Sequence, residues 1–261
     1  TVDVMALMIR WFDHYLKGKD NGAERDPTVR YYVMGAVGEE NAPGNEWRTA
    51  ADWPIASNAI PYYLHSEGKL TTDKPTQAEA TSTLLADPIH PVEIAGRSFP
   101  GARDASAVET QKNVLTFTTG VLEKPIEWTG KVRAEMFLSS SAKDTDLIVR
   151  VSDVYPDGRS ILIIDYIRRV RYREGYEQEV FMEPDKVYPV KFDVGSLSQI
   201  FNKGHRIRVT VTSTGAPFFE PNPNTGKPLT IEFPDDAVTA KNTIHHNSRY
   251  ASHIVAPVVG D

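Results

Sequence analysis

The feature that most constrains this fold is a change in sequence pattern after Gly22. From Pro27 onward the chain consists of short runs rich in Val, Ile, Thr, Tyr and Phe, separated by many of its 17 Gly and 18 Pro residues. Such runs are typical of β-strands, and no second long stretch with helical periodicity follows. In the runs 131–139 and 206–212 apolar and polar residues alternate, as in strands with one buried face. The pattern predicts an all-β fold, with strands at 29–34, 60–65, 114–118, 131–139, 147–154, 161–171, 187–194 and 206–212.

The spacing of these strands favours a sandwich over a closed up-and-down barrel. Long connections at 35–59, 66–112 and 213–245 separate the predicted strands, and a jelly roll requires long crossovers of this kind between its sheets. We therefore expect a two-sheet jelly-roll sandwich of the galactose-binding-domain-like kind. One hairpin is indicated directly at 155–159, where an Asp-Gly pair suits the positive φ of a tight turn.

The first 18 residues carry the only convincing helical pattern in the chain. Apolar residues recur there at helical spacing, and together they cover about half of the helix surface, more than a lone terminal helix normally shows. We therefore expect this helix to dock on a substantial surface. The apolar residues are Met5, Met8, Ile9, Trp11, Phe12, Tyr15 and Leu16.

Charge and composition exclude several classes of partner. The 261 residues include 29 Lys and Arg against 35 Asp and Glu, a formal net charge of −6, which gives no general attraction to nucleic acid or to anionic lipid. The longest aliphatic run is 161–164, far short of the roughly 20 apolar residues in a membrane-spanning helix. The absence of cysteine excludes disulfides and thiolate chemistry but assigns no compartment. We expect neither nucleic acid nor membrane as a partner.

No catalytic residue is indicated by a motif. The nucleophile elbow of serine α/β-hydrolases requires Gly-x-Ser-x-Gly, and the nearest match places Ser98 in Gly-Arg-Ser-Phe-Pro at 96–100, where Pro replaces the final Gly. A solvated loop serine is the better interpretation. Asp13 and His14 are adjacent in the predicted helix and diverge by about 100°, so they form no carboxylate–imidazole relay.

Two groups of residues are of metal-ligating types, but neither has the sequence spacing of a recognised metal site. His245 and His246, with His253 further on, are neighbours whose side chains point to opposite sides of an extended chain, which favours loop histidines bonded to backbone or water. Asp144 and Asp146 lie between two predicted strands, where the choice is between a calcium site and ordinary capping of a tight connection. We expect capping, and we expect no metal and no cofactor.

One basic cluster and a set of aromatic residues complete the candidates. Arg169, Arg171 and Arg173 would lie on one strand face, where single-stranded nucleic acid could bind. Because three glutamates follow at 174, 177 and 179, intramolecular pairing, or a charged edge that discourages sheet-to-sheet aggregation, is favoured instead. Aromatic residues in non-strand segments beside Gly and Pro are expected either to line a pocket or domain interface or to pin a long loop. They are Trp47, Trp53, Phe99, Phe218 and Phe219.

Eight short motifs follow one another in a characteristic order along nearly the whole chain. Each is modest alone, because Pro-Asp-Gly is simply a turn, but the set in register is specific. The motifs are WFDHYLKG at 11–18, VMG at 33–35, EWR at 46–48, DWP at 52–54, DTD at 144–146, VYPDGR at 154–159, GHRIR at 204–208 and PNPNTG at 221–226. In this order they resemble the C-terminal jelly-roll domain of the cocaine esterase/X-prolyl dipeptidyl-peptidase (CocE/NonD) family of α/β-hydrolases.

The resemblance implies that this chain lacks the catalytic machinery. In that family the Ser, Asp and His of the triad come from the α/β-hydrolase domain, and the helix with the Trp-Phe-Asp motif follows the catalytic His. The resemblance therefore assigns residues 1–25 to the terminal helix and linker of the preceding hydrolase domain, and 26–261 to the sandwich. The chain alone is expected to be inactive, and its implied partner is the hydrolase domain of the same parent chain.

The resemblance also implies roles for individual residues. A loop of this domain contributes apolar side chains to the acyl pocket in relatives, which makes Ser98, Phe99, Phe218 and Phe219 the candidates for lining one side of the substrate cleft. Residues expected to pack between domains are Met5, Met8, Ile9, Phe12, Trp47 and Trp53. An exposed apolar stripe also favours self-association, so a homo-oligomer is a second implied partner.

One alternative comes from a different class of protein. Jelly rolls with aromatic residues also serve as carbohydrate-binding modules, in which Trp or Tyr rings stack on sugar faces. Trp47 and Trp53 could play that part if they lay along one exposed sheet face. Because both are predicted in loops beside Pro or Gly, the non-catalytic hydrolase domain is favoured.

Overall fold

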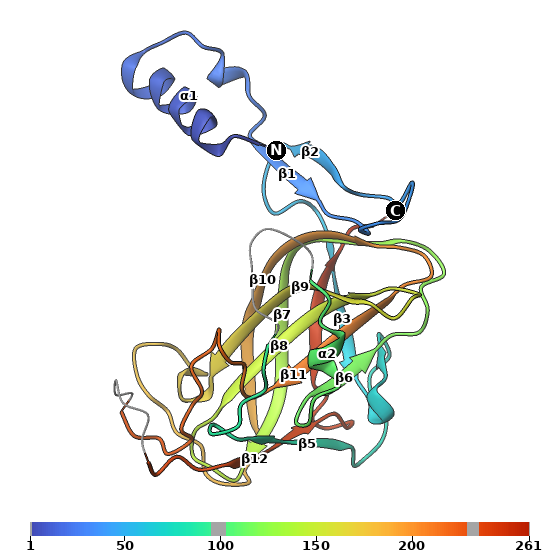
Figure 1. Cartoon of the computed structure of the whole chain (residues 1–261), viewed down its shortest axis with the longest axis vertical. Coiled ribbons are helices and arrows are strands. Elements are labelled where there is room, and N and C mark those ends of the chain that lie inside the picture. Colours follow the sequence, from blue (N-terminus) through green and yellow to red (C-terminus); the bar gives the residue numbers. More distant parts are fainter. Residues whose placement is uncertain (1, 95–102, 229–234, 261) are drawn as a thin grey trace.

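The computed structural model describes residues 2–94, 103–228 and 235–260, which form two facing antiparallel sheets, a separate two-stranded ribbon and an N-terminal helix (Figure 1). The larger sheet contains β3 (Asn58–Leu64), β4 (Leu70–Thr71), β5 (Thr81–Ala86), β7 (Ile126–Ser140), β10 (Tyr188–Phe201), β12 (Ala240–His245) and β13 (His253–Val258). The smaller sheet contains β6 (Leu115–Thr118), β8 (Asp146–Val154), β9 (Ser160–Arg169) and β11 (Arg206–Thr212). The ribbon pairs β1 (Val29–Val33) with β2 (Glu46–Ala50). The helices are α1 (Val4–Lys17), α2 (Ser106–Glu109) and the 3₁₀ turns η1 (Ala23–Arg25), η2 (Ser66–Gly68) and η3 (Val170–Tyr172).

Strand β7 is the centre of the larger sheet. It pairs with β10 over almost its whole length, and its opposite edge is shared by β13 and β12. The order of the larger sheet is β4-β3-β13-β7-β12-β5, and the order of the smaller sheet is β6-β11-β8-β9. The predicted all-β two-sheet sandwich is therefore confirmed, while its likeness to galactose-binding domains stays a prediction.

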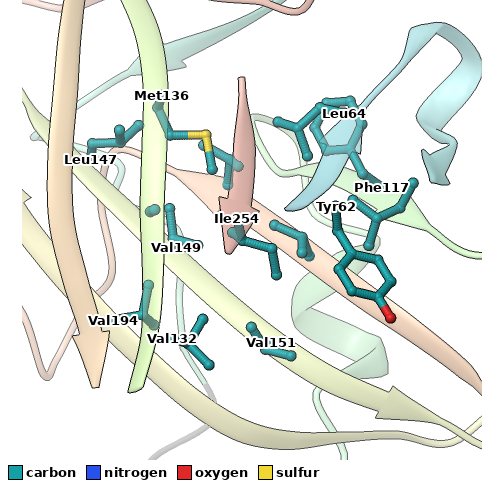
Figure 2. Packing of buried hydrophobic residues seen from close by; sticks show 14 of the residues in the cluster. Tyr62, Leu64, Phe117, Val132, Met136, Leu147, Val149, Val151, Val194 and Ile254 are labelled. Atoms are coloured by element: carbon teal, nitrogen blue, oxygen red, sulfur yellow. The ribbon is translucent and has the colours of Figure 1, made fainter. Parts of the chain in front are cut away.

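The hydrophobic core lies between the two sheets. Figure 2 shows Val132 and Met136 of β7 close to Val149 and Val151 of β8, all of them fully buried. The alternation noted at 131–139 is the cause, because every second side chain of β7 points into this layer. Trp128 is also fully buried.

The predicted strands are present, but several ends differ. The predicted strand 161–171 ends at Arg169, because the chain turns into η3 and Val170 N donates to Thr145 O at 2.9 Å. The predicted strand 187–194 continues to Phe201 through a bulge at Gly195, whose φ of 133° favours glycine. The predicted turn at 155–159 is confirmed, since Tyr155 N donates to Arg159 O at 2.8 Å.

Helix α1 projects away from the sandwich at the outer end of the ribbon (Figure 1). Asp3 caps its start by accepting from Ala6 N at 2.9 Å, and Gly18 ends it with a φ of 66°. The helix contacts the turn η1 but not the sandwich core. It is therefore an arm with its own exposed surface.

Candidate docking surface

Helix α1 presents its apolar side to solvent. The exposed fractions of its nine large apolar residues range from 42% for Leu7 to 74% for Leu16, and no residue of the helix is buried. At 100° per residue these side chains fill one continuous arc, which we call the apolar face of α1. The face consists of Val4, Met5, Leu7, Met8, Ile9, Trp11, Phe12, Tyr15 and Leu16.

The polar side of α1 is the side that contacts its own chain. Arg10 donates to both carboxylate oxygens of Asp26, at 2.6 and 3.2 Å, and Asn21 Nδ2 donates to Arg10 O at 2.7 Å. His14 Nδ1 lies 2.8 Å from Lys19 O. This is the reverse of an ordinary surface helix, whose apolar side packs inward. The arrangement holds the helix in place and leaves its apolar face open.

Asp13 and His14 form no relay, as expected from their helical divergence. Hydrogen bonds from Lys17 and Lys19, at 2.6 and 2.7 Å, occupy the Asp13 carboxylate and lower its pKa below the ordinary value. Both residues therefore stabilise the helix end.

The ribbon adds exposed aromatic surface next to α1. Trp47 is 46% exposed and contacts Tyr32 edge-on across the strand pair, with ring centroids 5.3 Å apart. The Arg30 guanidinium lies 5.1 Å from the Trp47 ring centre. The prediction that Trp47 lies in a loop is wrong, because a short strand without a buried residue carries no apolar alternation to reveal it.

Trp53 lies on a different side of the ribbon from Trp47. Its ring contacts Tyr31 at 5.5 Å, while Trp47 contacts Tyr32, and successive strand residues point to opposite faces. The two tryptophans therefore form no single flat platform. This arrangement argues against the carbohydrate-binding alternative.

The ribbon is joined to the sandwich at its tip, the segment 34–45. Met34 N donates to Ser198 O at 2.9 Å, and Ile200 N donates to Met34 O at 2.8 Å. Gly35 is required in this tip, because a Cβ there would lie 2.2 Å from Pro43 O. A hollow of about 380 Å³ lies beside the tip, between Pro43 and the ends of β7 and β13.

A buried histidine forms a second connection between the tip and the sandwich. The side chain of His205 is fully buried, with Nδ1 2.8 Å from Asp153 Oδ1 and Nε2 2.8 Å from Glu39 Oε1. The Tyr155 ring lies against the imidazole at 4.3 Å, and its hydroxyl accepts from Val37 N at 2.7 Å. We call Glu39, Asp153, Tyr155 and His205 the tip clasp.

Burial and hydrogen bonding act in opposite directions on the two carboxylates of the clasp. Burial raises the pKa of Asp153 to about 6, although the hydrogen bond to His205 works against this rise. Burial would also raise the pKa of Glu39, but hydrogen bonds from Asn202 and His205 outweigh it and hold that pKa below its ordinary value. Of the two carboxylates, Asp153 is therefore the one whose ionised form is disfavoured by burial.

The Phe218–Phe219 loop lies against a segment that leads towards Ser98. Ile94 N donates to Ala216 O at 2.8 Å, and Ala216 N donates to Val92 O at 3.0 Å. Phe218 is 40% exposed. Ser98 and Phe99 lie outside the described residues, so their predicted role stays a prediction.

The Asp144–Asp146 pair is bound by protein cations and amides. Arg171, which is 1% exposed, donates from Nε to Asp144 Oδ2 at 2.8 Å, and Arg169 binds both oxygens of Asp146 at 2.9 and 3.0 Å. Asn222 Nδ2 donates to both carboxylates, at 2.7 and 3.0 Å. These contacts occupy the oxygens that a calcium ion would need and so argue against the calcium interpretation.

The predicted intramolecular pairing of the basic cluster is confirmed, with a change of partners. Its two most buried ion pairs go to Asp144 and Asp146, and Glu179 adds a contact of 2.9 Å to Arg171. Arg171 lies in η3 and is buried, so the expected strand face of three arginines is not formed. The sequence did not reveal that these arginines pair with Asp144 and Asp146, because 23 to 27 residues separate the partners.

The histidine pair serves structure. His245 Nε2 lies 2.9 Å from the Ser139 hydroxyl, and His246 Nε2 lies 2.9 Å from the Ser82 hydroxyl. Burial lowers the pKa of both rings. The expectation of loop histidines is wrong for His245, which ends strand β12.

The described residues contain neither a cluster of three or more potential metal ligands nor a helix long and apolar enough to span a membrane.

Residues 21–255 match the model of the X-Pro dipeptidyl-peptidase C-terminal non-catalytic domain. The chain belongs to this domain family. It is 36% identical over 264 residues to cocaine esterase from Rhodococcus sp. (strain MB1 Bresler), a match that covers 95% of this chain and 45% of that protein. The chain thus spans less than half the length of this relative.

Solved structures give the same assignment. An α-amino acid ester hydrolase superposes with a TM-score of 0.84 at 26% identity, covering 97% of this chain and 44% of that chain. An aminopeptidase from a marine sediment archaeon, Thaumarchaeota archaeon, superposes with a TM-score of 0.83 at 26% identity, covering 99% and 44%. The predicted family and the non-catalytic nature of this domain are confirmed.

Replacing Arg171 by Met should destabilise this X-Pro dipeptidyl-peptidase C-terminal domain by about 3–5 kcal/mol, because the buried Asp144 would lose its cationic partner. Lys131→Met is the matched control, since it breaks an exposed pair with Asp193 and should cost about 1 kcal/mol or less. Urea unfolding measures both variants. Equal losses would contradict a structural role for the buried pair.

Proposed function

We propose that this domain packs on the α/β-hydrolase catalytic domain of its parent protein, a serine hydrolase that cleaves an ester or an X-Pro peptide or amide bond. The apolar face of α1 carries this proposal, because nine exposed apolar side chains on one helix require a covering surface. The relatives support the hydrolase domain as the surface that covers the apolar face of α1. The match covers only 44–45% of each of them, and the family is described as the non-catalytic C-terminal part of a peptidase.

In this proposal, residues 1–25 belong physically to the hydrolase domain, and the sandwich begins at residue 26. The inverted packing of α1 supports this division, because polar groups of the helix bind the segment 19–26, as in the contacts of Arg10 with Asn21 and Asp26. Trp47 and Trp53 extend the contact surface along the ribbon.

The chemistry of the parent enzyme would come from the other domain. A serine nucleophile attacks the carbonyl carbon, a histidine takes the serine proton, and an oxyanion hole stabilises the tetrahedral intermediate. The role of this chain is architectural: it covers the hydrolase domain and closes one side of the substrate cleft. Phe218 supports the cleft role, because it stands exposed on a short loop held by the Phe219 N to Gly215 O bond of 2.9 Å.

The docking role is tested with the double variant Met8→Glu/Phe12→Glu, which places two charges on the apolar face. Its dissociation constant for the separately produced hydrolase domain should rise by about 30-fold or more, because a central apolar contact contributes about 2 kcal/mol. Isothermal titration calorimetry measures the constant. Leu85→Glu on β5 of the sandwich is the control and should bind like the wild type.

Two outcomes would contradict docking on the hydrolase domain. One is an unchanged dissociation constant in the double variant. The other is a dimer of this chain that the same variant dissociates, while the hydrolase domain fails to bind the wild type.

The 261-residue chain alone should hydrolyse an activated ester no faster than the buffer does, because the proposed triad lies in the partner domain. Stopped-flow release of p-nitrophenol measures this directly. A burst of product equal to the protein concentration would indicate an acyl-enzyme and would place a nucleophile in this chain.

The cleft role is tested in the full-length enzyme with Phe218→Ala. The ratio of kcat/KM between a bulky and a small acyl substrate should change by about tenfold, since pocket contacts of this size discriminate substrates by 1–3 kcal/mol. Tyr176→Ala, which removes another exposed aromatic ring, is the control and should leave the ratio unchanged. An unchanged ratio in both variants would place Phe218 away from the cleft.

A further inference from the structure

The contacts of His205 fix the number of protons in the tip clasp. An ionised carboxylate only accepts hydrogen bonds, so a proton must lie in each of the two 2.8 Å contacts of the imidazole. A neutral imidazole carries one N–H group, and the second proton must therefore be added to the His205–Asp153 pair. The closed clasp holds one proton more than a neutral histidine with two carboxylates.

Burial of the clasp and the groups around it favour retention of this added proton. The side chains of His205 and Asp153 are fully buried, and burial raises the pKa of Asp153 to about 6, which disfavours an ionised Asp153 beside a neutral imidazole. The other charged group is Arg159, whose guanidinium lies 4.5 Å from the Tyr155 ring centre. The remaining neighbours are neutral: Asn202 donates to Glu39 at 2.8 Å, and Gln199 lies 3.4 Å from Asp153.

The three groups come from different parts of the chain. Glu39 belongs to the tip of the ribbon, Asp153 belongs to β8, and His205 precedes β11. The contacts of Glu39 with His205 and of Val37 with Tyr155 hold the tip beyond Met34, which is itself fixed by backbone hydrogen bonds. Opening the clasp would free the tip without unpairing the sandwich.

We propose that His205 and Asp153 form a proton-dependent clasp that fixes the ribbon tip on the sandwich and releases it as the pH rises. Release transfers the shared proton from the pair to solvent and leaves a nitrogen lone pair of the imidazole facing a carboxylate. Wherever the closed clasp keeps the added proton and the open clasp has lost it, closing takes up one proton, so the closing equilibrium falls by at most about tenfold per pH unit.

The direction of the pKa shift of Asp153 agrees with release of the tip at higher pH. Its pKa is higher in the folded protein, about 6, than its ordinary value of 3.8. A group of this kind stabilises the folded state fully below its ordinary pKa and loses that contribution as the pH rises through the folded value. The contribution of Asp153 therefore weakens the clasp as the pH rises.

Hydrogen–deuterium exchange of the 261-residue chain tests the clasp. The protection factor of the peptide 36–45, corrected for intrinsic exchange, should fall as the pH rises from 5 to 9, by at most about tenfold per unit, while that of β8 falls less. Asp153→Asn should remove this dependence, because the Asn amide can donate to the imidazole lone pair without an added proton. Asp193→Asn makes the same substitution at an exposed aspartate and should behave like the wild type.

A wild-type peptide 36–45 with constant protection would overturn the clasp, as would an Asp153→Asn variant that titrates like the wild type. Near-UV circular dichroism checks the fold of each variant. If Asp153→Asn does not fold, His205→Gln serves instead, because a glutamine does not titrate. Its protection should be constant with pH, and a titrating His205→Gln would again overturn the clasp. The measurement uses this chain alone, so its failure leaves the docking function untouched.

Discussion

The pairing of β7 on both of its edges is the constraint on which the rest of the structure depends. A 15-residue strand that pairs with β10 on one side and with β12 and β13 on the other commits every second side chain to the core. A one-residue shift would move Val132 and Met136 to the surface. The register of the larger sheet, and through it the position of the smaller one, follows from this alternation.

The fold was predictable from sequence where one face of a strand is apolar and the other polar. The strands β7 and β11 carried that signal, and the Asp-Gly turn between β8 and β9 was equally clear. The strands β2, β4, β5, β12 and β13 were missed, and two of them show a physical reason: β2 has no buried residue, and β12 carries the polar Asn242 between Ala240 and Ile244 on its buried face. Period-2 hydrophobicity is weak in both.

The candidate surface was predictable in part. The apolar stripe of α1 was visible in the sequence, but the polar contacts that turn it outward depend on Asn21 and Asp26, which carry no helical signal. The tip clasp was missed entirely, since Glu39, Asp153 and His205 are separated by 52 to 166 residues. The motifs at 154–159 and 204–208 contain Tyr155 and His205, but a motif does not identify the residues that its side chains contact.

The amide of Asn222 couples an exposed loop to a buried ion-pair network. It joins the two buried aspartates at the start of β8 to the segment that follows the Phe218–Phe219 loop. Loss of this amide would leave both carboxylates without one hydrogen-bond donor and would loosen the segment behind Phe218 at the same time. The position of an exposed aromatic side chain thus depends on a buried polar one.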